Sequence, residues 1–270
     1  MRGKMHADEV DTDSSLVRRL LADQFPQWGD LTIDPVESSG TDNAIYRLGE
    51  DMAVRLPRIS GGTGTIDKEL RWLPKLAPLL PVAISQPLAI GAPGGGYPWH
   101  WSVHRWLDGE SVNVERMADP VALAHDLGGF VVALRRIDTT GGPIAGRDGS
   151  RGVPLARRDA ATREAIAQLE GVVDVPAVTT AWEAAMRAPT WQRPGVWIHG
   201  DLLSGNVLID DSGRLSAVID FGCMAVGDPA CDVMAAWTLF EAEGRKVFRS
   251  AIGSMTPPGH GAAAGRSRSR

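Results

Sequence analysis

The sequence predicts an α+β protein with two unequal lobes. Three observations support this prediction: short segments of strand-like composition lie between residues 31 and 105, one long helix interrupts them, and helical patterns dominate from residue 119 onward. We therefore expect a small N-terminal lobe with an antiparallel sheet and a larger, mainly helical C-terminal lobe. The expected ranges are 1–107 for the first lobe with its hinge, 108–253 for the second, and 254–270 for a disordered tail.

Composition excludes several classes of protein. With 270 residues, 43% of them hydrophobic and 23% charged, the chain is typical of a globular protein with a sizeable core. Its formal net charge of −5 argues against a nucleic-acid binder. Two cysteines, Cys223 and Cys231, cannot build a disulfide framework. Because no apolar run spans a bilayer and no signal peptide is apparent, we expect a cytoplasmic monomer or dimer that binds neither nucleic acid nor membrane.

The N-terminal half contains two expected helices and a set of strands. Apolar residues at helical spacing predict a first helix over 16–25, capped by Ser14 or Ser15. A second helix is expected over 67–80, with Pro74 inside it. The expected strands are short and separated by turn-forming clusters, and they lie at about 31–37, 44–48, 52–56, 87–90 and 100–105.

The C-terminal half is predicted to be mainly helical. Residues 119–137 place large apolar side chains on or near one helical face. Further helical stretches and three short strands are expected, the helices at 156–169, 178–187 and 232–249 and the strands at 196–198, 206–209 and 215–219. The last two strands flank Asp210-Asp211-Ser212-Gly213, which predicts a hairpin with a four-residue loop.

A chemically informative stretch runs from His199-Gly200-Asp201 through Asn206 to Asp220-Phe221-Gly222. An Asp in a loop, an Asn five residues later and Asp-Phe-Gly beyond a hairpin are together typical of phosphoryl transfer, although an isolated Asp-Phe-Gly is a common turn. The Cα atoms of facing residues in an antiparallel pair lie about 4.5–5.5 Å apart. We therefore expect the hairpin to bring Asp220 beside Asn206. Because Mg²⁺ prefers carboxylate and amide oxygens, these two are the expected metal ligands. Asp201 is the expected catalytic base, which accepts the proton of an attacking hydroxyl.

With these motifs, the sequence resembles the aminoglycoside phosphotransferase family, the small-molecule branch of the protein-kinase-like fold. His199-Gly200-Asp201 stands where protein kinases usually carry His-Arg-Asp, and the stretch 227–232, Gly-Asp-Pro-Ala-Cys-Asp, is also similar to that family. The resemblance covers about residues 15–250 and implies a bilobal protein-kinase-like fold. It further implies that Asp232 opens a helix and that Asp232 and His199 support the catalytic loop.

The resemblance also implies where phosphates bind in the N-terminal lobe. Ser39, Gly40 and Thr41 lie where the family has its nucleotide-positioning loop, and small residues there let backbone amides approach phosphates. Arg55 occupies the place where many kinases have Lys. Its guanidinium keeps the positive charge, and Glu69 is the expected partner with which it steadies the phosphates.

Residues 101–109 resemble the last strand of the N-terminal lobe and the hinge that follows it. This likeness implies that the backbone of His104, Arg105 and Leu107 meets the adenine ring. The His104 side chain is not expected to act in catalysis.

These expectations combine into a Mg²⁺-dependent phosphotransferase that moves the γ-phosphate of ATP or GTP to a hydroxyl of a small molecule. An aminoglycoside-type antibiotic is the first expected acceptor, which would make the protein a resistance kinase. The six Asp and one Arg between residues 199 and 232 give a local charge of −5, which favours a polycationic acceptor only slightly because most of these carboxylates have other expected roles.

Two alternatives remain open. Choline, homoserine or a macrolide could be the acceptor, because the catalytic motifs are alike in all these kinases. The sequence also departs from the family, since no further helices follow Gly253. A protein that binds the nucleotide but transfers phosphate poorly is therefore a second hypothesis.

Overall fold

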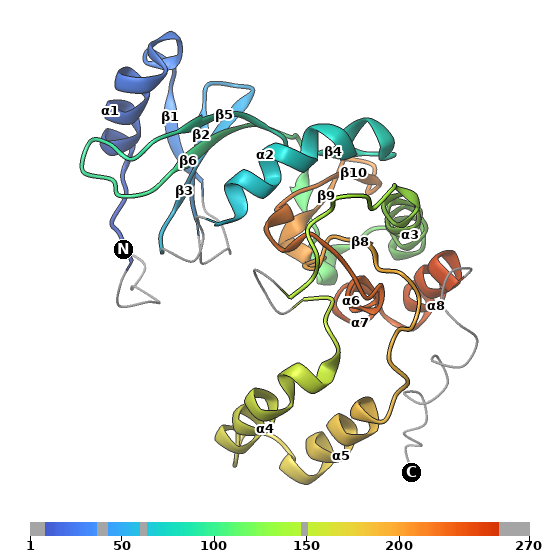
Figure 1. Ribbon diagram of the computed structural model, residues 1–270. Helices are drawn as coiled ribbons and strands as arrows, with labels where there is room; N and C mark the ends of the chain where they lie inside the picture. The colour runs from blue at the N-terminus through green and yellow to red at the C-terminus, as the bar shows by residue number, and fades with distance from the viewer. Residues whose placement is uncertain (1–8, 37–42, 60–63, 147–150, 254–270) are drawn as a thin grey trace.

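The computed structural model describes residues 9–36, 43–59, 64–146 and 151–253 (Figure 1). A strand-rich N-terminal part is joined to a larger, mainly helical C-terminal part, which confirms the predicted α+β class with an N-terminal antiparallel sheet. The expected disordered tail lies outside the described residues. Within the described ranges, no helix is both long enough and apolar enough to cross a membrane.

The N-terminal sheet has five antiparallel strands in the order β1-β2-β3-β6-β5. The strands are β1 (Ile33–Val36), β2 (Asn43–Leu48), β3 (Met52–Pro57), β5 (Pro87–Gly91) and β6 (Trp101–Arg105), close to the expected ranges. Buried residues alternate along β2, as expected for a strand with one face in a core. That core lies beneath helix α1 (Ser14–Gln24), which contributes four buried aliphatic side chains.

The cap of α1 differs from the prediction. The carboxylate of Asp13 accepts a hydrogen bond from the Leu16 amide at 2.6 Å, so Asp13 is the N-cap, whereas Ser14 and Ser15 lie within the first turn. A carboxylate at this place satisfies an amide that has no partner within the helix and also interacts favourably with the helix dipole.

Helix α2 (Gly64–Leu76) lies between the sheet and the C-terminal part (Figure 1). It begins three residues before the expected start, contains Pro74 as expected, and continues into a short 3-10 turn, Ala77–Leu79. Its buried residues Trp72, Leu73 and Leu76 belong to the C-terminal core. The helix therefore packs against both parts of the molecule.

The C-terminal part is built around helix α3 (Pro120–Arg136), which packs along α8 (Ala242–Ile252). Gly128 of α3 permits this close approach, because a Cβ at Gly128 would lie 2.5 Å from the Cβ of Ala251. Helices α4 (Asp159–Gln168) and α5 (Val175–Met186) agree with the expected helical stretches and extend away from this core (Figure 1).

Two small sheets support the C-terminal loops. The first has the order β4-β10-β9-β7 and contains β4 (Ala83–Ile84), β7 (Glu110–Ser111), β9 (Val207–Ile209) and β10 (Leu215–Val218). The second pairs β8 (Val196–Ile198) with β11 (Ala225–Gly227). Strands β4, β7 and β11 were not predicted, because segments of two or three residues carry no periodic pattern.

The helical prediction over 232–249 holds for most of its residues, but the chain there does not form a single helix. The chain instead forms α6 (Ala230–Val233), α7 (Ala235–Thr238) and α8. The turn before α8 places Phe240 against Phe248, with ring centroids 5.7 Å apart and both rings buried. The Arg245 guanidinium donates to the carbonyl groups of Ala236 and Phe240, each at 3.1 Å, and so satisfies carbonyls at the break.

Candidate active site

The β9–β10 hairpin places Asn206 opposite Ile219, the residue before Asp220, close to the pairing that the spacing predicts. Val207 faces Val218, and the Ile219 amide donates to the Asn206 carbonyl at 3.0 Å. Asp220 follows with a left-handed backbone, φ 59°, and is the only non-glycine residue with positive φ among the described residues. Its Oδ1 accepts from the Gly222 amide at 3.3 Å. Such a conformation is held by its surroundings and is found mostly at functional sites.

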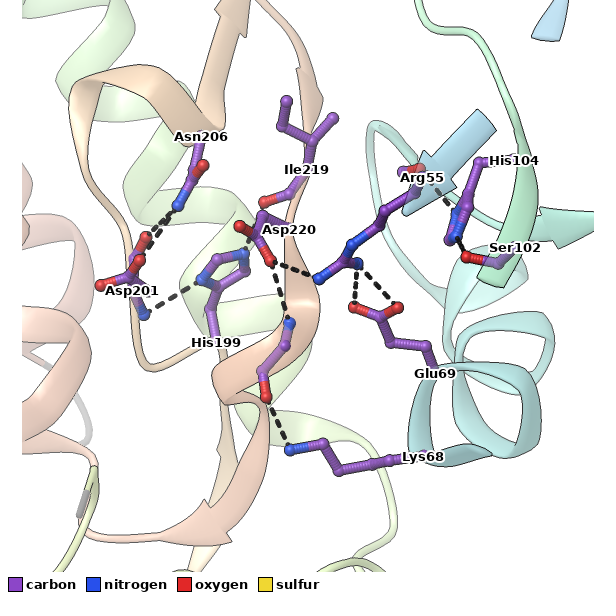
Figure 2. Close-up of polar contacts among 12 residues, drawn as sticks. Arg55, Lys68, Glu69, Ser102, His104, His199, Asp201, Asn206, Ile219 and Asp220 are labelled. Atoms are coloured by element: carbon purple, nitrogen blue, oxygen red, sulfur yellow. Dashed lines mark hydrogen bonds and ion pairs between the residues drawn. The ribbon is translucent and has the colours of Figure 1, made fainter. Parts of the chain in front are cut away.

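Asp201 is held in the loop before this hairpin (Figure 2). The Nδ2 group of Asn206 donates to the Asp201 carbonyl at 2.9 Å and to its carboxylate Oδ2 at 3.2 Å. The Leu203 amide also donates to the Asp201 carbonyl, at 2.8 Å. The Asp201 side chain retains 22% of its exposure, so the carboxylate is oriented by the protein and still open to a ligand.

Asp232 fixes the backbone of the loop that leads to Asp201. Its buried carboxylate accepts from the amides of His199, at 3.0 Å, and Gly200, at 2.8 Å. It lies inside α6 and does not open that helix, contrary to the expectation; instead the Asp228 side chain accepts from the amide of Ala230, the first helical residue. A buried carboxylate that accepts two amide hydrogen bonds fixes the backbone just before Asp201.

The His199 ring joins the two halves of the site. Its Nδ1 accepts from the Asp201 amide at 3.2 Å, so Nε2 carries the proton and donates to the Ile219 carbonyl at 3.0 Å (Figure 2). Burial lowers the pKa of His199, and the ring packs edge-on against Phe221 at 4.5 Å between centroids. A neutral imidazole thus ties the Asp201 loop to the strand that leads into Asp220.

The predicted ion pair between Arg55 and Glu69 is present. Arg55 Nη1 lies 2.9 Å from both carboxylate oxygens of Glu69, and Nη2 lies 3.5 Å from Asp220 Oδ1 (Figure 2). Burial raises the pKa of Glu69, and the positive charge of Arg55 acts in the opposite direction. Lys68, the neighbour of Glu69 on α2, donates to the Gly222 carbonyl at 2.7 Å. Strand β3 and helix α2 therefore both reach the loop that carries Asp220.

The structure gives less support to the other predicted nucleotide contacts. Ser39, Gly40 and Thr41 lie outside the described residues. The Arg105 amide donates to the Gln86 carbonyl at 3.1 Å, so this N–H group is not available to adenine. His104 lies in β6, which pairs with strands on both sides, so of the three predicted backbone contacts only Leu107 lies outside a strand.

The His104 side chain is buried among hydroxyl groups. Its Nδ1 lies 3.2 Å from Ser85 Oγ and its Nε2 lies 2.9 Å from Ser102 Oγ (Figure 2). Burial, together with the charge of Arg55, lowers the pKa of His104 to about 3. The ring is therefore neutral and has hydrogen-bond partners within the N-terminal part.

Sequence reasoning missed Arg151. Its Nη2 lies 2.9 Å from Asp201 Oδ1, although Arg151 comes from the glycine-rich connection between α3 and α4. A single arginine in such a loop gives no motif, and the contact spans 50 residues. Lys68 was missed because its contact with Gly222 also joins distant parts of the chain. Its position next to Glu69 was the only feature of the sequence that could have indicated a role at the site.

The donor set near Asp220 fits a hard cation. Both hydrogen bonds of Asn206 use Nδ2, which leaves its Oδ1 for a cation, and the Asp220 carboxylate lies after the facing strand. Among the described residues, no three His, Cys, Asp or Glu side chains form a metal-binding group. One carboxylate and one amide oxygen are suited to Mg²⁺ that is held jointly with phosphate oxygens and water.

Comparisons with known proteins show which family and which solved structures the chain is similar to. Residues 34–265 match the phosphotransferase enzyme family APH. The GDP and kanamycin complex of APH(2")-IIia is 25% identical, with a TM-score of 0.70 over 88% of this chain and 82% of that chain. The macrolide 2'-phosphotransferase MphH from Brachybacterium faecium is 26% identical, with a TM-score of 0.62 over 90% and 83%. The GDP complex of wild-type aminoglycoside 2'-phosphotransferase-IIIa is 22% identical, with a TM-score of 0.72 over 90% and 83%.

A search of the curated proteins finds no match. The family match covers most of the chain, and it agrees with the observed two-part fold. The chain therefore belongs to the APH phosphotransferase enzyme family, has its kinase-like α+β fold, and is a phosphotransferase that acts on a hydroxyl group of a small molecule.

Proposed function

We propose that this protein transfers the γ-phosphate of ATP or GTP to a hydroxyl of an aminoglycoside-type antibiotic, with Mg²⁺ as cofactor. The observation that carries the proposal is the contact between Asn206 Nδ2 and the Asp201 carboxylate, at 3.2 Å, on the hairpin that also carries Asp220. One loop and one hairpin thus present an oriented base beside a pair of hard oxygen donors.

Each residue has a distinct role in this reaction. Asp201 orients the acceptor hydroxyl and accepts its proton as the oxygen attacks phosphorus. Asp232 and His199 hold the backbone around that base. Arg55, fixed by Glu69, directs positive charge toward the phosphates.

Asn206 and Asp220 would hold the Mg²⁺. Held there, Mg²⁺ would neutralise the negative charge that develops on the phosphates during transfer. The nucleotide would lie against residues 1–107, including Ser39, Gly40 and Thr41 and the backbone of His104 and Leu107, and the acceptor would bind within 108–253.

The choice of acceptor rests on two relatives with different substrates. The structure that is 25% identical contains kanamycin, whereas the one that is 26% identical is a macrolide 2'-phosphotransferase. These identities are too similar to separate the two classes. A macrolide is therefore the second candidate, and choline and homoserine belong in any substrate panel.

The test is Mg²⁺-dependent release of nucleoside diphosphate from ATP and GTP in the presence of aminoglycosides, macrolides, choline and homoserine. Asp201→Asn removes the base, and Asp211→Asn is the matched control, because Asp211 is exposed in the hairpin loop. We expect acceptor-stimulated release that Asp201→Asn loses and Asp211→Asn keeps. Full activity of Asp201→Asn would contradict the assigned base. Thermal stabilisation by MgATP without transfer to any acceptor would favour a protein that only binds nucleotide.

A further inference from the structure

Arg151 contacts the proposed catalytic base from outside the catalytic loop. Its Nη2 lies 2.9 Å from Asp201 Oδ1, whereas Asn206 occupies the other carboxylate oxygen, Oδ2. The Arg151 side chain is 41% exposed and that of Asp201 is 22% exposed. The ion pair therefore lies at the solvent-facing side of the base, the side from which an acceptor can approach.

This ion pair changes the charge that an acceptor meets. An unpaired carboxylate attracts the ammonium groups of a cationic acceptor, but a carboxylate already paired with a guanidinium attracts them less. An ammonium close to the reacting hydroxyl must also approach Arg151 itself, and like charges at short distance are unfavourable.

The segment that carries Arg151 is rich in arginine. Residues 151–163 contain four Arg and one Asp, a formal charge of +3. Arg163 is neutralised locally, since it lies 2.9 Å from Asp159 and 3.8 Å from Glu183. The Arg151 guanidinium is the member of this segment that reaches Asp201.

We propose that Arg151 is a specificity-determining residue, which disfavours acceptors with several ammonium groups relative to acceptors with one. This proposal rests on the proposed function, because it assumes that the acceptor hydroxyl binds at Asp201. Within that function it predicts a preference for acceptors with few ammonium groups, so it weighs against polycationic aminoglycosides and in favour of the macrolide, the second candidate.

The experiment compares Arg151→Gln with Arg163→Gln. The second variant removes the same charge from α4 but leaves the Asp201 ion pair intact. Binding of neomycin, a polycation, and of erythromycin, which carries one amine, is measured by calorimetry in the presence of MgADP. Arg151→Lys is included because it keeps the charge.

We expect Arg151→Gln to bind neomycin about fivefold more tightly than the parent protein, with little change for erythromycin. The gain should shrink in about 0.5 M NaCl, because salt screens exposed charges. Arg163→Gln and Arg151→Lys should keep the parental ratio of the two affinities. An unchanged or lower neomycin affinity in Arg151→Gln would overturn the proposal, as would a parent and a variant that bind neither compound.

Different measurements test the proposed function and the role of Arg151: turnover tests the first and binding tests the second. Full activity of Asp201→Asn contradicts the function, whichever acceptor the protein binds. The ratio of binding constants in Arg151→Gln decides the role of Arg151 without requiring any transfer.

Discussion

Glu69 is a buried carboxylate that holds the guanidinium of Arg55. Both of its oxygens accept from Arg55, which also faces Asp220 at 3.5 Å. Burial favours the neutral form of Glu69, and the Arg55 charge favours the ionised form. If the carboxylate is removed, the guanidinium loses the partner that fixes its position beside Asp220.

We therefore predict that Glu69→Gln raises the KM for ATP or lowers kcat by about tenfold, the loss expected when a charged hydrogen-bond pair is broken. Steady-state kinetics with the preferred acceptor measure this effect. Asp67→Asn is the matched control, since Asp67 lies on the same helix with an exposed side chain. Equal kinetics for the two variants would show that Arg55 needs no partner.

The protonation of His104 makes the stability of the protein depend on pH. Its pKa is lowered to about 3 in the folded protein, first by burial and then by Arg55, from an ordinary value of 6.5. Below pH 6.5 the unfolded chain takes up a proton that the folded chain does not. This contribution to stability is therefore complete above pH 6.5 and is lost as the pH falls toward 3.

The prediction is that the free energy of unfolding falls by up to about 1.4 kcal/mol for each pH unit below 6.5 owing to His104 alone. In His104→Asn, which cannot titrate, the pH dependence should be shallower by that amount. Urea unfolding at pH 7 and pH 5.5 measures both slopes. Parallel slopes would mean that His104 is protonated in the folded state.

The sequence allowed the centre of the site to be predicted, but only part of its surroundings. Asp201, Asn206 and Asp220 lie within one loop and hairpin, so local spacing was enough to bring them together. The contacts of Arg151 and Lys68 span 50 and 154 residues. Such contacts depend on how distant elements pack, and no local pattern encodes that packing.

Among the elements, long amphipathic helices were the easiest to predict and short strands the hardest. Helix α3 carries eight buried residues along one stripe, which gives a strong periodic signal. Strand β4 has two residues and exists because it pairs in parallel with β10, more than a hundred residues away. The break before α8 is likewise set by the packing of Phe240 on Phe248, which a count of apolar residues does not show.

The contact between α3 and α8 gives a prediction with an internal control. Gly128→Ala should destabilise the protein by about 1–3 kcal/mol, because its Cβ would lie 2.5 Å from that of Ala251. Gly129→Ala on the same helix meets nothing within 4 Å and should instead stabilise the protein by about 0.5–1 kcal/mol. Urea denaturation of the two variants checks both signs, and a stabilised Gly128→Ala would contradict the observed packing.

At the scale of the whole molecule, the two parts are joined by more than the hinge. Helix α2 contributes Trp72, Leu73 and Leu76 to the C-terminal core, and β4 belongs to a C-terminal sheet although it precedes the hinge in the chain. The Lys68 ammonium adds a polar link to the Gly222 carbonyl at 2.7 Å. Movement of α2 would therefore displace the loop that carries Asp220.

We predict that Lys68→Met lowers kcat/KM for the nucleotide about threefold to tenfold while the melting temperature changes little, because one hydrogen bond from a charged group is lost and the aliphatic stem is kept. Lys75→Met on the same helix is the control, since Lys75 lies over the Trp72 ring, away from Gly222. Unchanged kinetics in Lys68→Met would show that the nucleotide site does not depend on this link.

The left-handed backbone at Asp220 has a practical consequence for trapping both substrates on the protein. Only Gly, Asn and Asp adopt this conformation readily, so most substitutions there disturb the turn as well as the charge. Asp220→Asn keeps the turn and removes the carboxylate. We expect it to give a folded protein with little transfer activity, which would be suited to crystallisation together with a nucleoside triphosphate and an unreacted acceptor.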